Sequence, residues 1–117
     1  MHNYSFPKSR VLNQKGEISR IFAEGSFWRS DNYKFKYLRG ERFGLVISVS
    51  KRVGSSPERN RIKRLVREAI RQRGDLDQQP WQLALFITNP PQSQPQLVEM
   101  QAILAKLFDH LHEVQRP

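Results

Sequence analysis

The spacing of apolar residues along the 117-residue chain predicts three helices and four strands. Apolar side chains recur with the three-to-four-residue period of an amphipathic helix in residues 13–25, 57–74 and 97–114. Aromatic or β-branched runs, which are typical of strands, occupy residues 26–29, 33–37, 43–49 and 81–88. The order αβββαβα predicts an α+β fold, a sandwich in which helices pack on one sheet.

Residues that favour helix ends indicate where two of these helices begin and end. Asn13 and Ser56 stand where N-caps are expected, and Pro57 suits a first helical turn. Gly25 and Gly74 suit helix ends. The first and second helices are therefore expected to start and stop at these residues.

Residues 33–37 alternate strictly between aromatic and lysine side chains. In a strand this places the aromatics on one face, which we expect to be the core, and Lys34 and Lys36 on the other. The first three strands follow one another closely, so we expect an antiparallel meander. Residues 1–12 are polar and basic and are expected to form an extended arm. No composition break divides the chain, so residues 1–117 are expected to form a single domain.

Basic residues outnumber acidic ones and gather in the first two thirds of the chain. The sequence holds 20 Lys+Arg against 11 Asp+Glu, a formal net charge of +9. Residues 1–74 carry 18 of the former and 6 of the latter, whereas residues 75–117 carry 2 and 5. This concentration is typical of a surface that binds nucleic acid or an anionic membrane.

The composition excludes several classes of protein. Cysteine is absent, which removes disulfides, thiolate catalysis and Cys-type zinc sites. No apolar run approaches the roughly 18–20 residues of a membrane span, and the N-terminus lacks the pattern of a secretory signal. We therefore expect a small soluble cytoplasmic protein without a membrane partner. The sequence does not indicate which oligomeric state the protein adopts.

The helix predicted over residues 57–74 separates apolar from basic side chains. Its apolar stripe centres near Ala69, and Arg59 and Arg61 flank a polar cluster on the opposite side: Asn60, Lys63, Arg64, Arg67 and Arg71. Like charges four residues apart each cost roughly 0.2–0.5 kcal/mol in an isolated helix. Stability does not favour that spacing, whereas a phosphate backbone does; a solvated helix face is the alternative. Asn60 either bonds a nearby backbone carbonyl or meets a nucleotide or a hydrated metal ion.

Two adjacent segments carry a resemblance to a known family. Residues 44–54 read GLVISVSKRVG, and residues 58–69 read ERNRIKRLVREA. An Arg-Asn-Arg-x-x-[Lys/Arg]-Arg-x-x-Arg helix after a strand and a Ser-Lys-Arg-Val-Gly loop resembles the signature of the protein component of bacterial ribonuclease P. Residues 18–25, with the pattern IxxIFxxG, are similar to the first helix of that family.

The resemblance implies that the chain assists an RNA enzyme. In the family a large RNA holds the catalytic centre and, with Mg²⁺, removes the 5′ leader of precursor tRNA, while the small protein binds both the RNA and the leader. No cofactor is implied on the protein itself. By similarity, contacts with the catalytic RNA are expected from Lys51, Arg52, Arg59, Asn60, Arg61, Lys63, Arg64, Arg67 and Arg71. A cleft between the first helix and the sheet is expected to take the single-stranded leader, with matching positions Ile18, Phe22, Lys34 and Lys36.

The family also implies a mixed sheet with a central basic helix and a left-handed crossover from the third strand to the fourth, against the usual ~98% right-handed rule. This chain departs from the family pattern in two places. Ile18, Lys34 and Lys36 stand where the family often has aromatic or aliphatic residues, so the cleft is expected to bind leader phosphates more and stack bases less. Thr88 stands where an arginine is common, which removes the contact expected there.

The sequence contains no evident catalytic site of its own. His110 and His112 lie two positions apart on a helix and so face apart, and no phosphate-binding glycine loop occurs. We therefore expect a non-catalytic subunit without a metal site. Two alternatives stay open. A ribosomal or general RNA-binding module predicts binding without turnover, and an autonomous metal-dependent nuclease predicts cleavage by the protein alone.

Overall fold

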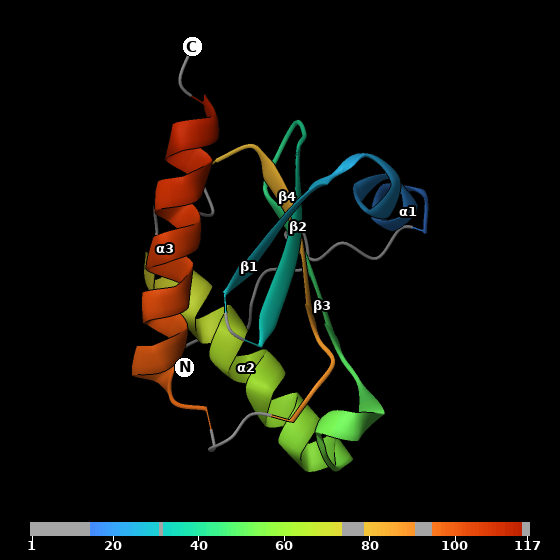
Figure 1. Ribbon diagram of the computed structural model, residues 1–117, viewed down its shortest axis with the longest axis vertical. Coiled ribbons are helices and arrows are strands. Elements are labelled where there is room, and N and C mark those ends of the chain that lie inside the picture. The colour runs from blue at the N-terminus through green and yellow to red at the C-terminus, as the bar shows by residue number, and fades with distance from the viewer. Residues whose placement is uncertain (1–14, 31, 74–78, 91–94, 116–117) are drawn as a thin grey trace, which may run out of the picture.

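The computed structural model describes residues 15–30, 32–73, 79–90 and 95–115. Its elements follow the predicted order αβββαβα (Figure 1). They are α1 (Lys15–Glu24), β1 (Ser26–Ser30), β2 (Tyr33–Arg39), β3 (Gly44–Val49), the short 3-10 helix η2 (Lys51–Val53), α2 (Ser56–Arg73), β4 (Trp81–Ile87) and α3 (Leu97–Gln115). The predicted arm at residues 1–12 and the predicted end residues Asn13 and Gly74 lie outside the described residues.

The four strands form one mixed sheet in the order β1-β2-β4-β3. The β1–β2 and β2–β4 pairs are antiparallel, and the β3–β4 pair is parallel. The predicted meander of the first three strands is therefore wrong, because β3 pairs with β4 and not with β2. Residues 81–85 of β4 are all buried, which suits an interior strand. The chain reaches β4 from β3 through α2; the left-handedness of this crossover stays a prediction.

Helices cover both faces of the sheet (Figure 1). Helices α2 and α3 lie on one side, and α1 lies on the other. Tyr33, Phe35 and Tyr37 are buried in the larger core beneath α2 and α3, which confirms the face predicted from their alternation with lysine. Lys34 and Lys36 consequently lie on the α1 side of the sheet.

A small cluster holds α1 against the sheet. Ile21 and Ala84 are fully buried in it, surrounded by the partly buried Ile18, Leu38 and Val46. Gly25 ends the helix, and its N–H donates to the Ile21 carbonyl at 2.8 Å. A Cβ on Gly25 would stand 2.4 Å from that carbonyl oxygen and 3.1 Å from the oxygen of Tyr37. Only glycine therefore lets α1 end this close to β2.

Candidate nucleic-acid interface

A capping box starts α2 at Ser55. The Ser55 backbone N–H and hydroxyl donate to Oε1 of Glu58 at 2.8 and 2.9 Å, and the Glu58 N–H donates back to the serine oxygen at 3.4 Å. The predicted cap, Ser56, is instead the first helical residue, because Ser55 is the serine that stands three positions before Glu58. The bond from the Ser55 backbone, followed by that from its hydroxyl, lowers the pKa of the Glu58 carboxyl.

The apolar stripe of α2 faces the sheet, as the helical wheel predicts. Ile62, Val66, Ala69 and Ile70 are buried. The side chains in the middle of the opposite side make no hydrogen bond or ion pair with any other described residue. They are Asn60, Arg61, Lys63, Arg64 and Arg67. We call these five residues the α2 cationic face. Its cations are left to bind water, counterions or an anionic partner.

Arg59 precedes this face and is already held by the protein. Its Nε donates to the Gly54 carbonyl at 3.2 Å, and its Nη2 donates to the Ser56 hydroxyl at 3.0 Å. Both acceptors belong to the segment between η2 and the first turn of α2. Arg59 therefore fixes the basic loop against the helix, and fewer of its donors remain for a ligand.

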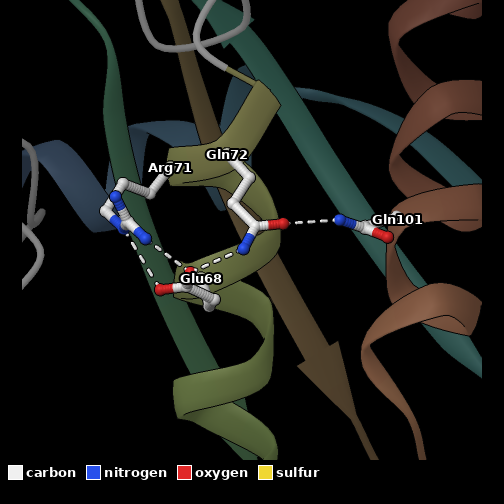
Figure 2. A network of polar contacts seen from close by, with 4 residues as sticks. All are labelled: Glu68, Arg71, Gln72 and Gln101. Atoms are coloured by element: carbon white, nitrogen blue, oxygen red, sulfur yellow. Dashed lines mark hydrogen bonds and ion pairs between the residues drawn. The ribbon is translucent and has the colours of Figure 1, made fainter. Parts of the chain in front are cut away.

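Arg71, at the other end of the predicted ladder, is also engaged (Figure 2). Its guanidinium pairs with both carboxylate oxygens of Glu68, which also accepts a bond from Gln72 at 2.8 Å. Gln72 in turn accepts a bond from Gln101 of α3 at 2.6 Å. The bond from Arg71 is the largest cause that lowers the pKa of Glu68, and burial opposes it. This network connects α2 to α3 and offsets the charge of Arg71.

Lys51 and Arg52 extend the basic character past the N-terminal end of α2. Both are exposed on η2, directly after β3. The Ser50 N–H donates to the Ile87 carbonyl at 2.9 Å, and the Ser50 hydroxyl accepts from the Arg52 N–H at 3.3 Å. These bonds fix the loop at the ends of the parallel strands. The two cations thus adjoin the helix that carries the α2 cationic face.

A second group of cations lies on the α1 side of the sheet. Lys34 Nζ donates to the Thr88 hydroxyl at 3.2 Å, so a cation from β2 reaches the position where the family's arginine is missing. Lys36 Nζ donates to the carbonyl of Phe22 at 2.6 Å and stands 6.0 Å from the centre of its ring. Phe22, Lys34 and Lys36 are therefore brought together, while Ile18 packs into the cluster beneath α1.

Two aromatic residues on this side were not among the predicted site residues. Phe27 is 53% exposed, and the half-buried Phe86 contacts both Phe27 and Phe22, with ring centres 6.5 and 5.8 Å apart. The sequence signal for Phe27 is its place beside Trp28 in a predicted strand, because adjacent strand residues point to opposite faces. In the structure Trp28 packs on the core residue Phe35, which leaves Phe27 on the α1 side. We call Phe22, Phe27 and Phe86 the phenylalanine cluster.

The comparison with known families settles the kinship of the chain. A sequence model of the family described as Ribonuclease P matches residues 6–112. The chain belongs to the ribonuclease P protein family. The match extends well beyond the motif segments that first suggested it, and it covers both the α2 cationic face and the phenylalanine cluster.

Individual relatives agree with this assignment. The ribonuclease P protein component of Desulfosudis oleivorans is 36% identical over 110 residues, which cover 92% of this chain and 90% of the relative. That of Dictyoglomus thermophilum is 39% identical over 70 residues, 58% of each chain. The matched segment thus spans less than two thirds of the D. thermophilum relative, and the same holds for Dictyoglomus turgidum, at 59%.

Solved ribonuclease P proteins share the fold. The protein from Staphylococcus aureus has a TM-score of 0.75 at 20% identity, covering 89% of this chain and 96% of that one. The protein from Thermotoga maritima has a TM-score of 0.72 at 18% identity, with 86% and 96% covered. At this level of identity the likeness concerns the α+β architecture, including its mixed sheet.

The histidines of this family member have structural contacts. The Tyr37 hydroxyl lies 2.8 Å from Nε2 of His110, at hydrogen-bond distance, and the His112 ring packs on Phe108 with centres 4.4 Å apart. Within the described ranges, no three His, Asp or Glu side chains are grouped so that they could hold a metal ion. None of the described helices is long and apolar enough to cross a membrane.

Proposed function

We propose that this chain is the protein subunit of ribonuclease P and that α2 binds the catalytic RNA. The observation that carries the proposal is the α2 cationic face, where Lys63, Arg64 and Arg67 have no acidic partner among the described residues. Like charges at this spacing repel one another, and phosphates would relieve that repulsion. The planar guanidinium of arginine suits phosphate oxygens. Lys51 and Arg52 on η2 extend this RNA-binding surface. Arg59 and Arg71 mainly hold α2 in place, Arg59 against the preceding loop and Arg71 through the network that reaches α3.

We also propose that the α1 side of the sheet binds the 5′ leader of precursor tRNA. Two features support this second contact: the ammonium groups of Lys34 and Lys36 on β2, and the exposed ring of Phe22 on α1. Lysines bind the phosphates of a single strand, and exposed aromatic rings stack on its unpaired bases. The placement of Lys34 beside Thr88 compensates for the arginine that is common there in the family.

We place the chemical step on the RNA, in the cytoplasm where precursor tRNA is processed. The Mg²⁺ ions of such an RNA enzyme would stabilise the attacking and leaving oxygens during hydrolysis. The part of the chain described here offers no cluster of ligands for these ions, and Glu58 and Glu68 are engaged by Ser55 and Arg71. The role of the protein is then to neutralise phosphates and to orient both RNAs.

Reconstitution tests this function. The chain, mixed with the ribonuclease P RNA of its own organism, is expected to enable precursor-tRNA cleavage at low magnesium and moderate salt, where that RNA alone is slow. The protein without RNA is expected to be inert. RNA binding without any gain in cleavage would favour a general RNA-binding module. Magnesium-dependent cutting that survives nuclease removal of the RNA would make the chain an autonomous nuclease. Either result overturns the proposal.

A further inference from the structure

The phenylalanine cluster exposes apolar surface that the packing of α1 does not need. Ile21 and Ala84 already bury the contact between helix and sheet. Phe22 and Phe27 nevertheless remain 44% and 53% exposed. The Phe86 ring lies in contact with both of them. The three rings thus form a continuous surface that runs from α1 across the sheet to β1.

The strand register interleaves this surface with cations. Phe27 pairs with Lys36 across β1 and β2, and Lys34 pairs with Arg29 on one side and with Phe86 on the other. Lys34 and Lys36 lie two positions apart on one face of β2, about 6.6–6.8 Å along the strand. The three strands β1, β2 and β4 contain no Asp or Glu. These strands therefore place cations and no carboxylate beside the rings, and the two acidic residues of α1, Glu17 and Glu24, pair with Arg42 and Arg20.

This combination selects one kind of partner. A purely apolar peptide or a lipid tail would leave the ammonium groups without counter-charges. A nucleic-acid duplex keeps its base faces stacked inside, so the rings would remain in water. A single strand offers both phosphates and free base faces, and aromatic rings beside basic side chains are the usual means of binding it.

We propose that Phe27 and Phe86 widen the leader-binding surface to the edge strand β1, and that Phe27 stacks on an unpaired base whose neighbouring phosphates contact Lys34 and Lys36. The inference rests on the proposed function, since it assigns the bound single strand to the leader. It also revises the expectation that lysines at positions 34 and 36 make this surface bind phosphates at the expense of bases. The stacking rings come instead from β1 and β4.

Phe27 is the informative residue to change, because its exposed ring can be removed with little loss of packing. The full chain carrying Phe27→Ala, Phe27→Leu or Phe27→Trp is titrated with a short single-stranded oligoadenylate and with an abasic oligomer of equal length and charge. Val98→Ala, which truncates a 75% exposed apolar side chain on α3, is the matched control.

We expect Phe27→Ala to weaken oligoadenylate binding about five-fold or more, the low end of what one base–aromatic stack contributes. Binding of the abasic oligomer should not change, Phe27→Trp should restore affinity, and Val98→Ala should bind like the original chain. Equal losses for both oligomers would overturn the inference. Phe27→Leu binding as tightly as the original chain would overturn it as well, since an aliphatic side chain cannot stack.

The reconstituted holoenzyme separates this inference from the proposed function. Phe27→Ala should weaken its binding of precursor tRNA and leave its binding of mature tRNA unchanged. If the original holoenzyme cleaves precursor and Phe27→Ala changes neither affinity, the stacking role is wrong and the proposed function stands. If the original chain yields no active holoenzyme, the proposed function fails. The oligomer comparison still decides whether Phe27 stacks on bases.

Discussion

Arg59 and Arg64 carry the same charge on the same helix, yet their guanidinium groups have different surroundings. The Arg59 guanidinium donates to Gly54 and Ser56, whereas that of Arg64 is exposed and bonds no other described residue. A helical wheel gives the direction of each side chain but not the acceptors that the neighbouring loop brings to it. The sequence therefore predicts a uniform row of cations, and the structure divides it into positioning residues at the ends and a free middle.

The free middle of the row predicts that removing one of its arginines lowers the affinity for RNA. Arg64→Ala or Arg67→Ala should weaken binding of the catalytic RNA and flatten the slope of log affinity against log salt by roughly 0.7–0.9 for each phosphate that is no longer neutralised. Filter binding over a salt series measures both. Lys106→Ala removes the same charge from an exposed position of α3 and is the control. An unchanged slope for Arg64→Ala and Arg67→Ala would identify the α2 cationic face as merely solvated.

The capping box gives a prediction about pH. The Glu58 pKa is lowered from an ordinary value of 4.5, so the charge of this group stabilises the folded chain above that value, and the gain disappears as the pH falls through the lowered pKa. Glu58→Gln keeps the hydrogen-bonding shape and removes the charge. In urea denaturation, Glu58→Gln should be less stable than the original chain. The difference should be constant at about neutral pH and should shrink below roughly pH 4.5. A deficit that grows in acid would contradict the capping role.

At the scale of elements, the sequence predicts faces better than partners. The Tyr-Lys alternation of β2 correctly separates its buried and α1-side faces, because side-chain direction is local. Which strand lies beside β3 depends on the crossover through α2, and the alternation does not contain that information. A signal was nevertheless present: residues 43–49 and 81–88 are both nearly continuous apolar runs, a pattern typical of parallel neighbours covered on both faces.

Gly16 within α1 and Gly25 directly after it test how the helix is seated against the sheet. Gly25→Ala should lower the melting temperature, because its Cβ would stand 2.4 Å from the Ile21 carbonyl oxygen, which distorts the end of α1, and 3.1 Å from the Tyr37 carbonyl oxygen of β2. Gly16→Ala is the matched control, since a Cβ there meets nothing within 4 Å and alanine favours a helix by up to about 1 kcal/mol. Calorimetry compares the two. Equal melting temperatures for both variants would show that α1 does not depend on the close approach at Gly25.

At the scale of the whole molecule, the charge excess of residues 1–74 divides between two faces of the sheet. Helix α2, which carries the α2 cationic face, covers one side, and α1 lies on the other (Figure 1). Lys36 donates to the Phe22 carbonyl of α1, so Lys34 and Lys36 lie on the α1 side. The sequence predicted both groups of residues, because each follows from a local period. That they lie on opposite sides of one sheet is a property of the topology. Under the proposed function, this arrangement would let one small protein contact two RNA segments at once.

Opposite faces predict independent effects. Arg64→Ala should weaken assembly with the catalytic RNA, whereas Lys34→Ala should weaken binding of precursor tRNA by the assembled holoenzyme and spare mature tRNA. Effects of residues without shared partners usually add within about 0.3–0.5 kcal/mol, so the double variant should combine the assembly loss of Arg64→Ala with the precursor-binding loss of Lys34→Ala, each unchanged from the single variant. A double-mutant cycle measures this with precursor and mature tRNA as paired ligands. Lys34 is more informative than Lys36 here, because Lys36 also holds the Phe22 carbonyl at the end of α1.

The cycle also distinguishes how the two faces cooperate. If the single strand passed from α2 around the sheet edge to β2, the two cations would share one ligand, and the double variant would lose less than the sum. If the catalytic RNA covered both faces, Lys34→Ala would impair assembly as strongly as Arg64→Ala and would weaken mature and precursor tRNA alike. Additive losses, with that of Lys34→Ala confined to precursor tRNA and that of Arg64→Ala to assembly, would instead show that the sheet separates two RNA contacts, one for the enzyme and one for its substrate.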